Sequence, residues 1–264
     1  MPATTGLVLA AGAVAGSAAG AAMHRWPSGA TLRAPRRSKC DACGVELRIR
    51  DLIPIVSWAV LRGACRTCGV RIDPRLPLLE SAAALMAVVI VHAHGTSIAA
   101  AVLALGSVAV LVGACIDVEH LIVPDRLTLP LAVLSLAALP VVAGRDRAAA
   151  TAAWAIGVPL ALYVLALAAD RTGRARPVGG GDIKLLVGVL ALSGVAPQGP
   201  PGVLLGAVVL AGSAATVGLL TGRLTRRSRL PFAPALAVPF LVVVAAPERA
   251  ADIVNIIGGH PWSV

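Results

Sequence analysis

Long apolar stretches constrain this sequence more than any other feature. Eight runs approach or reach the roughly 20 residues that a helix needs to cross a bilayer. They lie at about residues 4–23, 77–93, 97–115, 127–143, 149–169, 183–197, 201–221 and 233–247. Only 14% of the 264 residues are charged, against about a quarter in a soluble domain. We therefore predict an all-α, polytopic membrane protein of about eight transmembrane helices.

The basic residues predict how these helices are oriented. Twenty of the 23 Lys and Arg side chains lie in or directly after the connections that follow the first, third, fifth and seventh runs. Lys and Arg beside membrane spans are retained in the cytoplasm, so both termini are predicted to lie outside it. Arg25, the first cation, follows the first apolar run, which favours a retained helix over residues 1–23 and not a cleaved signal peptide.

A net charge of +10 is compatible with a nucleic-acid partner, but here the cations lie between apolar runs and not along one face. We expect them to contact membrane lipid, and we predict no nucleic-acid partner. The sequence contains no signal for a particular oligomeric state.

Two pairs of cysteines lie in the one long polar connection, residues 24–76. Cys40 and Cys43 form the first CxxC motif, and Cys65 and Cys68 form the second. This spacing resembles a zinc ribbon, in which four thiolates hold one structural zinc ion in a segment too small for a strong core. A redox pair and four merely buried thiols are the alternatives. A cytoplasmic position, which is reducing, argues against disulfides. The fifth cysteine, Cys115, is predicted to be a small buried hydrophobe.

Two aspartates stand at the edges of predicted spans. Asp117 follows the third run, and Asp182 opens the sixth directly after Gly179, Gly180 and Gly181. Both are predicted at the same membrane face, where ionisable groups tend to line a functional site. A facing carboxylate pair can divide general-acid and general-base roles, and the helix dipoles favour Asp182 as the base and Asp117 as its protonated partner. The glycines would let an extended substrate backbone approach closely. The alternative for each aspartate alone is an exposed helix-end residue.

Several segments together resemble one family, the prepilin peptidases (type IV leader peptidases), which are membrane aspartic peptidases of the GxGD type. The segments are GAVAGSAAGAAMHRWP, the two CxxC pairs, DLIPIVSWAVLRG, RIDPRLPLLE, CIDVEHLIVPD, GGGDIKLL and LPFAPALAVPF. They span nearly the whole chain in the family's order.

The resemblance implies an inner-membrane endopeptidase that removes the basic leader of prepilins or pseudopilins at the cytoplasmic face. It implies Asp117 and Asp182 as the catalytic pair, and we expect Lys184 and the preceding glycines to contact substrate. Lys184 is also placed to meet lipid phosphates, whereas Asp125 is predicted to cap a helix. The implied organisation is a first transmembrane helix (1–23), a cytoplasmic four-cysteine module (24–76) and a membrane aspartic peptidase domain (77–264).

Many family members also methylate the new N-terminus with S-adenosylmethionine. A Gly-Lys pair before the third cysteine of the family corresponds here to Gly63 and Ala64, so only the glycine matches. Glu80 of the family's PLxE segment is present. The sequence therefore leaves open the methyltransferase activity, and with it the use of S-adenosylmethionine.

Two other functions compete with the peptidase. One is a non-enzymatic assembly or transport protein with a zinc-stapled docking module. That class predicts acids distributed through several spans, whereas here the middles of the spans carry almost no charge. The other keeps a methyltransferase or chaperone-like role without peptidase action.

Overall fold

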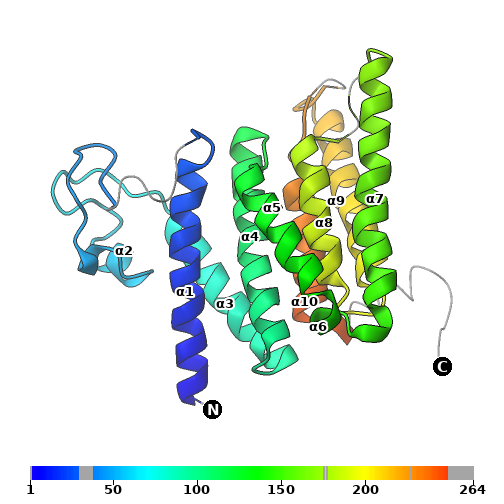
Figure 1. Ribbon diagram of the computed structural model, residues 1–264. Coiled ribbons are helices and arrows are strands. Elements are labelled where there is room, and N and C mark those ends of the chain that lie inside the picture. Colours follow the sequence, from blue (N-terminus) through cyan, green and yellow to red (C-terminus); the bar gives the residue numbers. More distant parts are fainter. Residues whose placement is uncertain (1, 30–37, 175, 177, 226–227, 249–264) are drawn as a thin grey trace.

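The computed structural model describes residues 2–29, 38–174, 176, 178–225 and 228–248 (Figure 1). Within these ranges the chain is helical and forms no strand. Residue 1, residues 30–37 of the predicted four-cysteine module, and residues 175, 177, 226–227 and 249–264 of the predicted peptidase domain lie outside the described residues. The helices are α1 (Pro2–Arg25), the 3-10 helix η1 (Ile49–Asp51), α2 (Val56–Val60), α3 (Arg75–His94), α4 (Ile98–His120), α5 (Asp125–Ala137), α6 (Leu139–Val142), α7 (Arg145–Arg171), α8 (Gly180–Ser193), α9 (Gly199–Leu220) and α10 (Ala233–Ala245).

Each of the eight predicted apolar runs is helical, and the fourth is divided into α5 and α6. In the described part of the chain, five helices are long and apolar enough to cross a membrane: α1, α3, α4, α7 and α9. The helices α5, α8 and α10 have 13, 14 and 13 residues. At 1.5 Å per residue, each of these three is roughly 20 Å long, shorter than a bilayer core of about 30 Å. The predicted all-α, multi-pass membrane fold is confirmed, and the count of eight spans stays a prediction.

Glycines allow α1 and α3 to pack closely. Gly12, Gly16 and Gly20 recur every four residues and so lie on one face of α1. A Cβ atom added at Gly16 would lie 2.7 Å from the Cα of Glu80, and one at Gly12 would lie 2.7 Å from the Cα of Ala84. Small residues at this spacing let helix backbones approach each other within a membrane. The two helices that flank the four-cysteine module are thereby held side by side (Figure 1).

The short helix α8 lies inside the bundle. It packs against α4, α5, α6, α7, α9 and α10, and its side chains Leu185, Val189 and Leu192 are fully buried. Neighbouring helices therefore fix the position of its first turn, which carries Asp182.

Successive long helices run in opposite directions (Figure 1). The ends of α1, α4, α7 and α9 lie at the same end of the bundle as the starts of α3, α5, α8 and α10. That end carries the four-cysteine module, whose described part contains η1, α2 and two isolated β-bridges. The module, Asp117 and Asp182 therefore belong to the same end of the molecule.

Candidate active site and metal centre

Asp117 lies in the last turn of α4 and is almost fully buried, with 3% of its surface exposed. Its Oδ2 atom accepts a hydrogen bond of 2.9 Å from the backbone N–H of Ala233, the first residue of α10. The first N–H groups of a helix have no partner within the helix, so they are available to a carboxylate. The start of α10 thus holds the Asp117 carboxyl group in one orientation.

Asp182 lies in the first turn of α8, directly after the three glycines. Gly179 is the N-cap of this helix and has an extended backbone conformation. The Oδ1 atom of Asp182 is buried, and no described residue donates a hydrogen bond to it. A buried carboxylate oxygen of this kind is available to a water molecule or a substrate group.

The two aspartates line one pocket of about 220 Å³. The other lining residues come from the α4–α5 connection and from the glycine segment: Leu121, Ile122, Val123, Gly179, Gly180 and Gly181. The structure therefore brings together Asp117 and Asp182, which are 65 positions apart in the chain.

The glycines before Asp182 have different surroundings. A Cβ atom at Gly181 would lie 2.6 Å from the carbonyl oxygen of Val123, and one at Gly179 would lie 2.8 Å from Oδ2 of Asp182. Around Gly180 there is no described atom within 4 Å of such a Cβ position. Gly181 thus allows the pocket wall to close, whereas Gly180 leaves open space beside the aspartates.

A second pocket of about 360 Å³ adjoins the first, because Gly180 lines both. It lies between α7 and α8, and its apolar walls include Leu167, Val178 and Ile183. Asp170 and Arg176 at its rim form a two-pronged ion pair with distances of 2.7 and 2.6 Å. These charges neutralise each other, so the pocket is suited to an uncharged group.

Lys184 also lines this second pocket, and its Nζ atom is 2.6 Å from Oδ1 of Asp125. Asp125 is the first residue of α5 and not its N-cap, which is Pro124. The ion pair therefore joins the start of α5 to α8, beside the pocket that Asp117 and Asp182 line. A contact of Lys184 with substrate or lipid stays a prediction.

The four cysteines of the CxxC motifs meet in the four-cysteine module. All four Sγ atoms lie within 4.8 Å of one another, and Cys40 and Cys68 are 3.8 Å apart. Tetrahedral zinc with Zn–S bonds of about 2.3 Å requires sulfur atoms roughly 3.8 Å apart, so the cluster fits that ion. Backbone N–H groups of Cys68 and Thr67 lower the pKa of the Cys65 thiol to about 7. Against the backbone N–H of Val70, desolvation and the neighbouring thiols raise the pKa of Cys68 to about 12, so a thiolate is favoured at Cys65 first.

The two CxxC loops have the same backbone geometry. Gly44 and Gly69 have φ angles of 69° and 71°, and each donates a hydrogen bond to the carbonyl oxygen of Cys40 or Cys65, respectively. This repeated loop presents both sulfur atoms of each pair on one side. The predicted clustering of the four cysteines is confirmed, and the identity of the ion that they hold is a proposal.

Gly63 and Glu80, the two residues that the family resemblance links to methylation, each make contacts that hold the local structure. Glu80, buried on α3, accepts a hydrogen bond of 2.6 Å from the backbone N–H of Ile55, the N-cap of α2. Gly63 has a φ angle of 69°, and a Cβ atom there would lie 2.9 Å from the ring of Trp58. Neither of the two pockets described above includes Gly63 or Glu80. We assign no methylation step to these contacts.

The sequence predictions missed two parts of the site. One is the backbone of Ala233, which belongs to the segment LPFAPALAVPF and donates to Asp117. The other is Leu121–Val123, which forms a wall of the pocket that Asp117 and Asp182 line. Both lie in segments that carry the family resemblance, and this was the only signal for them in the sequence.

Two family models match consecutive parts of this chain. The family model described as Bacterial Peptidase A24 N-terminal domain matches residues 10–94, and that of the Type IV leader peptidase family matches residues 104–217. No solved structure matches the chain.

Several curated proteins are similar over most of the chain. A prepilin leader peptidase/N-methyltransferase of Dichelobacter nodosus is 35% identical over 76% of this chain and 68% of its own length. A protein of the same name from Bacillus subtilis (strain 168) is 33% identical over 81% of this chain and 82% of its own. A type 4 prepilin-like proteins leader peptide-processing enzyme of Escherichia coli O78:H11 is 32% identical over 76% and 72%. The chain belongs to the type IV leader peptidase family.

Proposed function

We propose that this protein is an inner-membrane endopeptidase that removes the leader of prepilins or pseudopilins. The observation that carries this proposal is the single pocket lined by Asp117 and Asp182. Membership of the family supports the reaction and the prepilin substrate class.

The geometry suggests general acid and base catalysis without a covalent intermediate. A substrate backbone extended along Gly179–Gly181 would bring its scissile bond between the two aspartates, and Gly180 leaves room for it. One carboxylate would remove a proton from a water molecule as the water attacks the carbonyl carbon. The other, protonated, carboxyl group would donate its proton to the leaving amine. The adjoining apolar pocket would accept an uncharged side chain of the substrate.

In this proposal the four-cysteine cluster holds a structural zinc ion. Four thiolates fill a tetrahedral coordination sphere and leave no position for a water molecule, so the ion would stabilise the module without joining the hydrolysis. The division into 1–23, 24–76 and 77–264 is part of the same proposal.

We also propose that the four-cysteine module and the aspartates face the cytoplasm and that both termini lie outside it. The excess of Lys and Arg at that end of the bundle, including Arg171, Arg174 and Arg223, supports this orientation and contact with lipid headgroups. Single cysteines placed at Thr96 and at Thr172 should react with a membrane-impermeant reagent from opposite sides.

Mass spectrometry of a model prepilin, incubated with the purified protein in detergent, tests the activity. We expect a cut after the leader, and no cut by Asp117→Asn or Asp182→Asn. Cleavage by either variant at the parent rate would refute the catalytic assignment. With S-adenosylmethionine added, a mass increase of one methyl group on the new N-terminus would establish the second activity that the relatives' names contain.

A further inference from the structure

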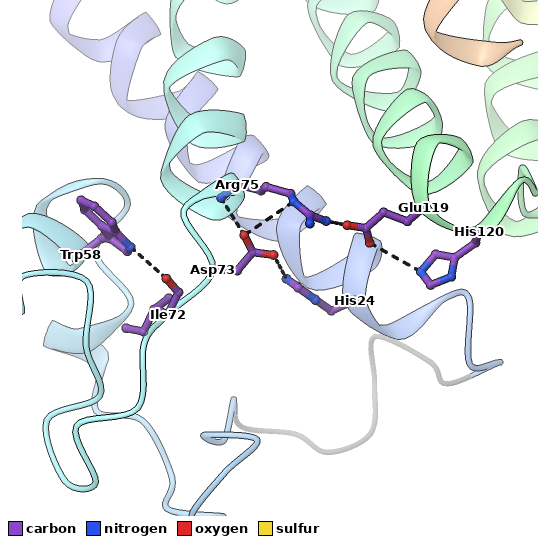
Figure 2. A network of polar contacts seen from close by, with 7 residues as sticks. All are labelled: His24, Trp58, Ile72, Asp73, Arg75, Glu119 and His120. Carbon is purple, nitrogen blue, oxygen red and sulfur yellow. Dashed lines mark hydrogen bonds and ion pairs between the residues drawn. The ribbon is translucent and has the colours of Figure 1, made fainter. Parts of the chain in front are cut away.

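A chain of charged side chains connects the four-cysteine module to the end of α4 (Figure 2). Arg75, the first residue of α3, forms an ion pair with Glu119 of α4. Asp73, in the segment that leaves the module, accepts a hydrogen bond of 2.9 Å from the backbone N–H of Arg75 and lies 3.9 Å from His24 of α1. Three helices and the module exit thus meet at one place.

The module is also tied to the start of α5. A guanidinium nitrogen of Arg126 donates a hydrogen bond of 2.9 Å to the carbonyl oxygen of Gly29. Gly29 follows α1, where the chain leaves the bundle toward the module, and Asp73 lies where it returns. Both connections of the module are therefore held by residues of the α4–α5 region.

These two ties lie on either side of the catalytic pocket wall. Glu119 comes two residues after Asp117, and Arg126 follows the wall segment Leu121–Val123 by three positions. Leu121 itself has a left-handed backbone, with a φ angle of 53°, a conformation that is unfavourable for a leucine. The backbone N–H of Leu121 donates a hydrogen bond of 2.9 Å to the carbonyl oxygen of Asp117, so the conformation of this connection and the position of Asp117 are coupled.

We propose that Arg75 and Glu119 are positioning residues for peptide cleavage: through their ion pair the four-cysteine module sets the conformation of the α4–α5 connection and so the placement of Asp117. The inference rests on the proposed catalytic role of Asp117. It gives the module a role in the peptidase reaction, in addition to any role in methylation.

The ion pair between Arg75 and Glu119 is too exposed to contribute much to the stability of the fold. The two side chains are 54% and 28% exposed. Loss of the pair should therefore leave the protein folded, while a small displacement of a catalytic carboxylate reduces the rate strongly. The effect is expected on kcat and not on KM, because neither side chain lines the two pockets described here.

A double-mutant cycle on the cleavage reaction tests the proposal. Arg75→Gln and Glu119→Gln should each lower kcat about fivefold at unchanged KM, and the double variant should lose no more than either single variant. Glu46→Gln removes an ion pair of similar exposure inside the module, that of Lys39 and Glu46 at 3.8 Å, and should keep the parent kcat. Thermal unfolding of all four variants should stay close to that of the parent.

Unchanged kcat in both single variants, losses that add in the double variant, or losses that follow the unfolding temperature would each overturn the proposal. Asp117→Asn, measured in the same assay, separates failure of this positioning role from failure of the proposed function. If Asp117→Asn is inactive while Arg75→Gln and Glu119→Gln match the parent, the catalytic aspartate stands and the positioning role falls.

Discussion

At Gly181 the backbone of α8 approaches the α4–α5 connection so closely that no side chain fits between them. A single methyl group there would lie 2.6 Å from the carbonyl oxygen of Val123, whereas one at Gly180 would meet no described atom within 4 Å. The two neighbouring glycines therefore differ in what they do. Gly181 lets the wall of the pocket close, and Gly180 leaves open space beside the aspartates.

We predict that Gly181→Ala lowers the free energy of unfolding by about 1–3 kcal/mol, since either Val123 or the start of α8 must move. Gly180→Ala should leave stability unchanged and reveal its effect only as a higher KM. Thermal unfolding and cleavage kinetics of the two variants check this pair of outcomes. Equal stability of both variants would contradict the close contact at Gly181.

The sequence allowed us to predict the acidic residues of the pocket and the glycines before Asp182, but not the other groups around them. Asp117 and Asp182 are conspicuous because ionisable groups are rare at span edges. The donor to Asp117 is the backbone N–H of Ala233, and a backbone group leaves no mark in the residue type. The close contact between Gly181 and Val123 joins positions 58 apart, so the glycine run alone could not show which glycine is needed for packing.

At the scale of elements, α1 and α3 form a helix pair in which glycines remove the side chains from the interface. Gly16 of α1 lies against Glu80 of α3, whose carboxylate in turn binds the N-cap of α2. Packing of these two helices therefore also positions the module.

Gly16→Ala should separate α1 from α3 and lower the unfolding temperature, because its Cβ atom would lie 2.7 Å from the Cα of Glu80. Gly6→Ala in the same helix is the matched control, since no described atom lies within 4 Å of that Cβ position. It should be neutral or slightly stabilising, as alanine favours a helix over glycine by about 1 kcal/mol. A Gly16→Ala protein as stable as Gly6→Ala would show that α1 and α3 are not in close contact.

Hydropathy predicted the helices themselves but not where they break. The fourth run looks continuous, yet α5 ends at Ala137 and α6 begins at Leu139. Pro140 explains the break, because it has no N–H to donate to the preceding turn. The central position of α8 depends on packing with six other helices, which no local pattern contains.

The described part of the four-cysteine module contains too little regular structure to be stable without a cross-link. Its regular elements are η1, α2 and two β-bridges. The four sulfur atoms within 4.8 Å of one another supply that cross-link when they hold a metal ion.

Elemental analysis should therefore find about one zinc ion per chain, and a strong chelator should lower the unfolding temperature of the module. Cys68→Ser should lose the ion. Cys115→Ser, which changes a cysteine of α4 outside the cluster, should keep it. Metal-free, fully reduced protein with an intact module would contradict the zinc site.

If Asp117 and Asp182 act as one catalytic unit, the rate of prepilin cleavage by single and double aspartate variants should show it. Groups that act together are strongly non-additive, because loss of either member already removes the mechanism. We predict that Asp117→Asn, Asp182→Asn and the double variant all fall to the same residual rate. Partial losses that multiply in the double variant, or a single variant that retains the parent rate, would contradict the account.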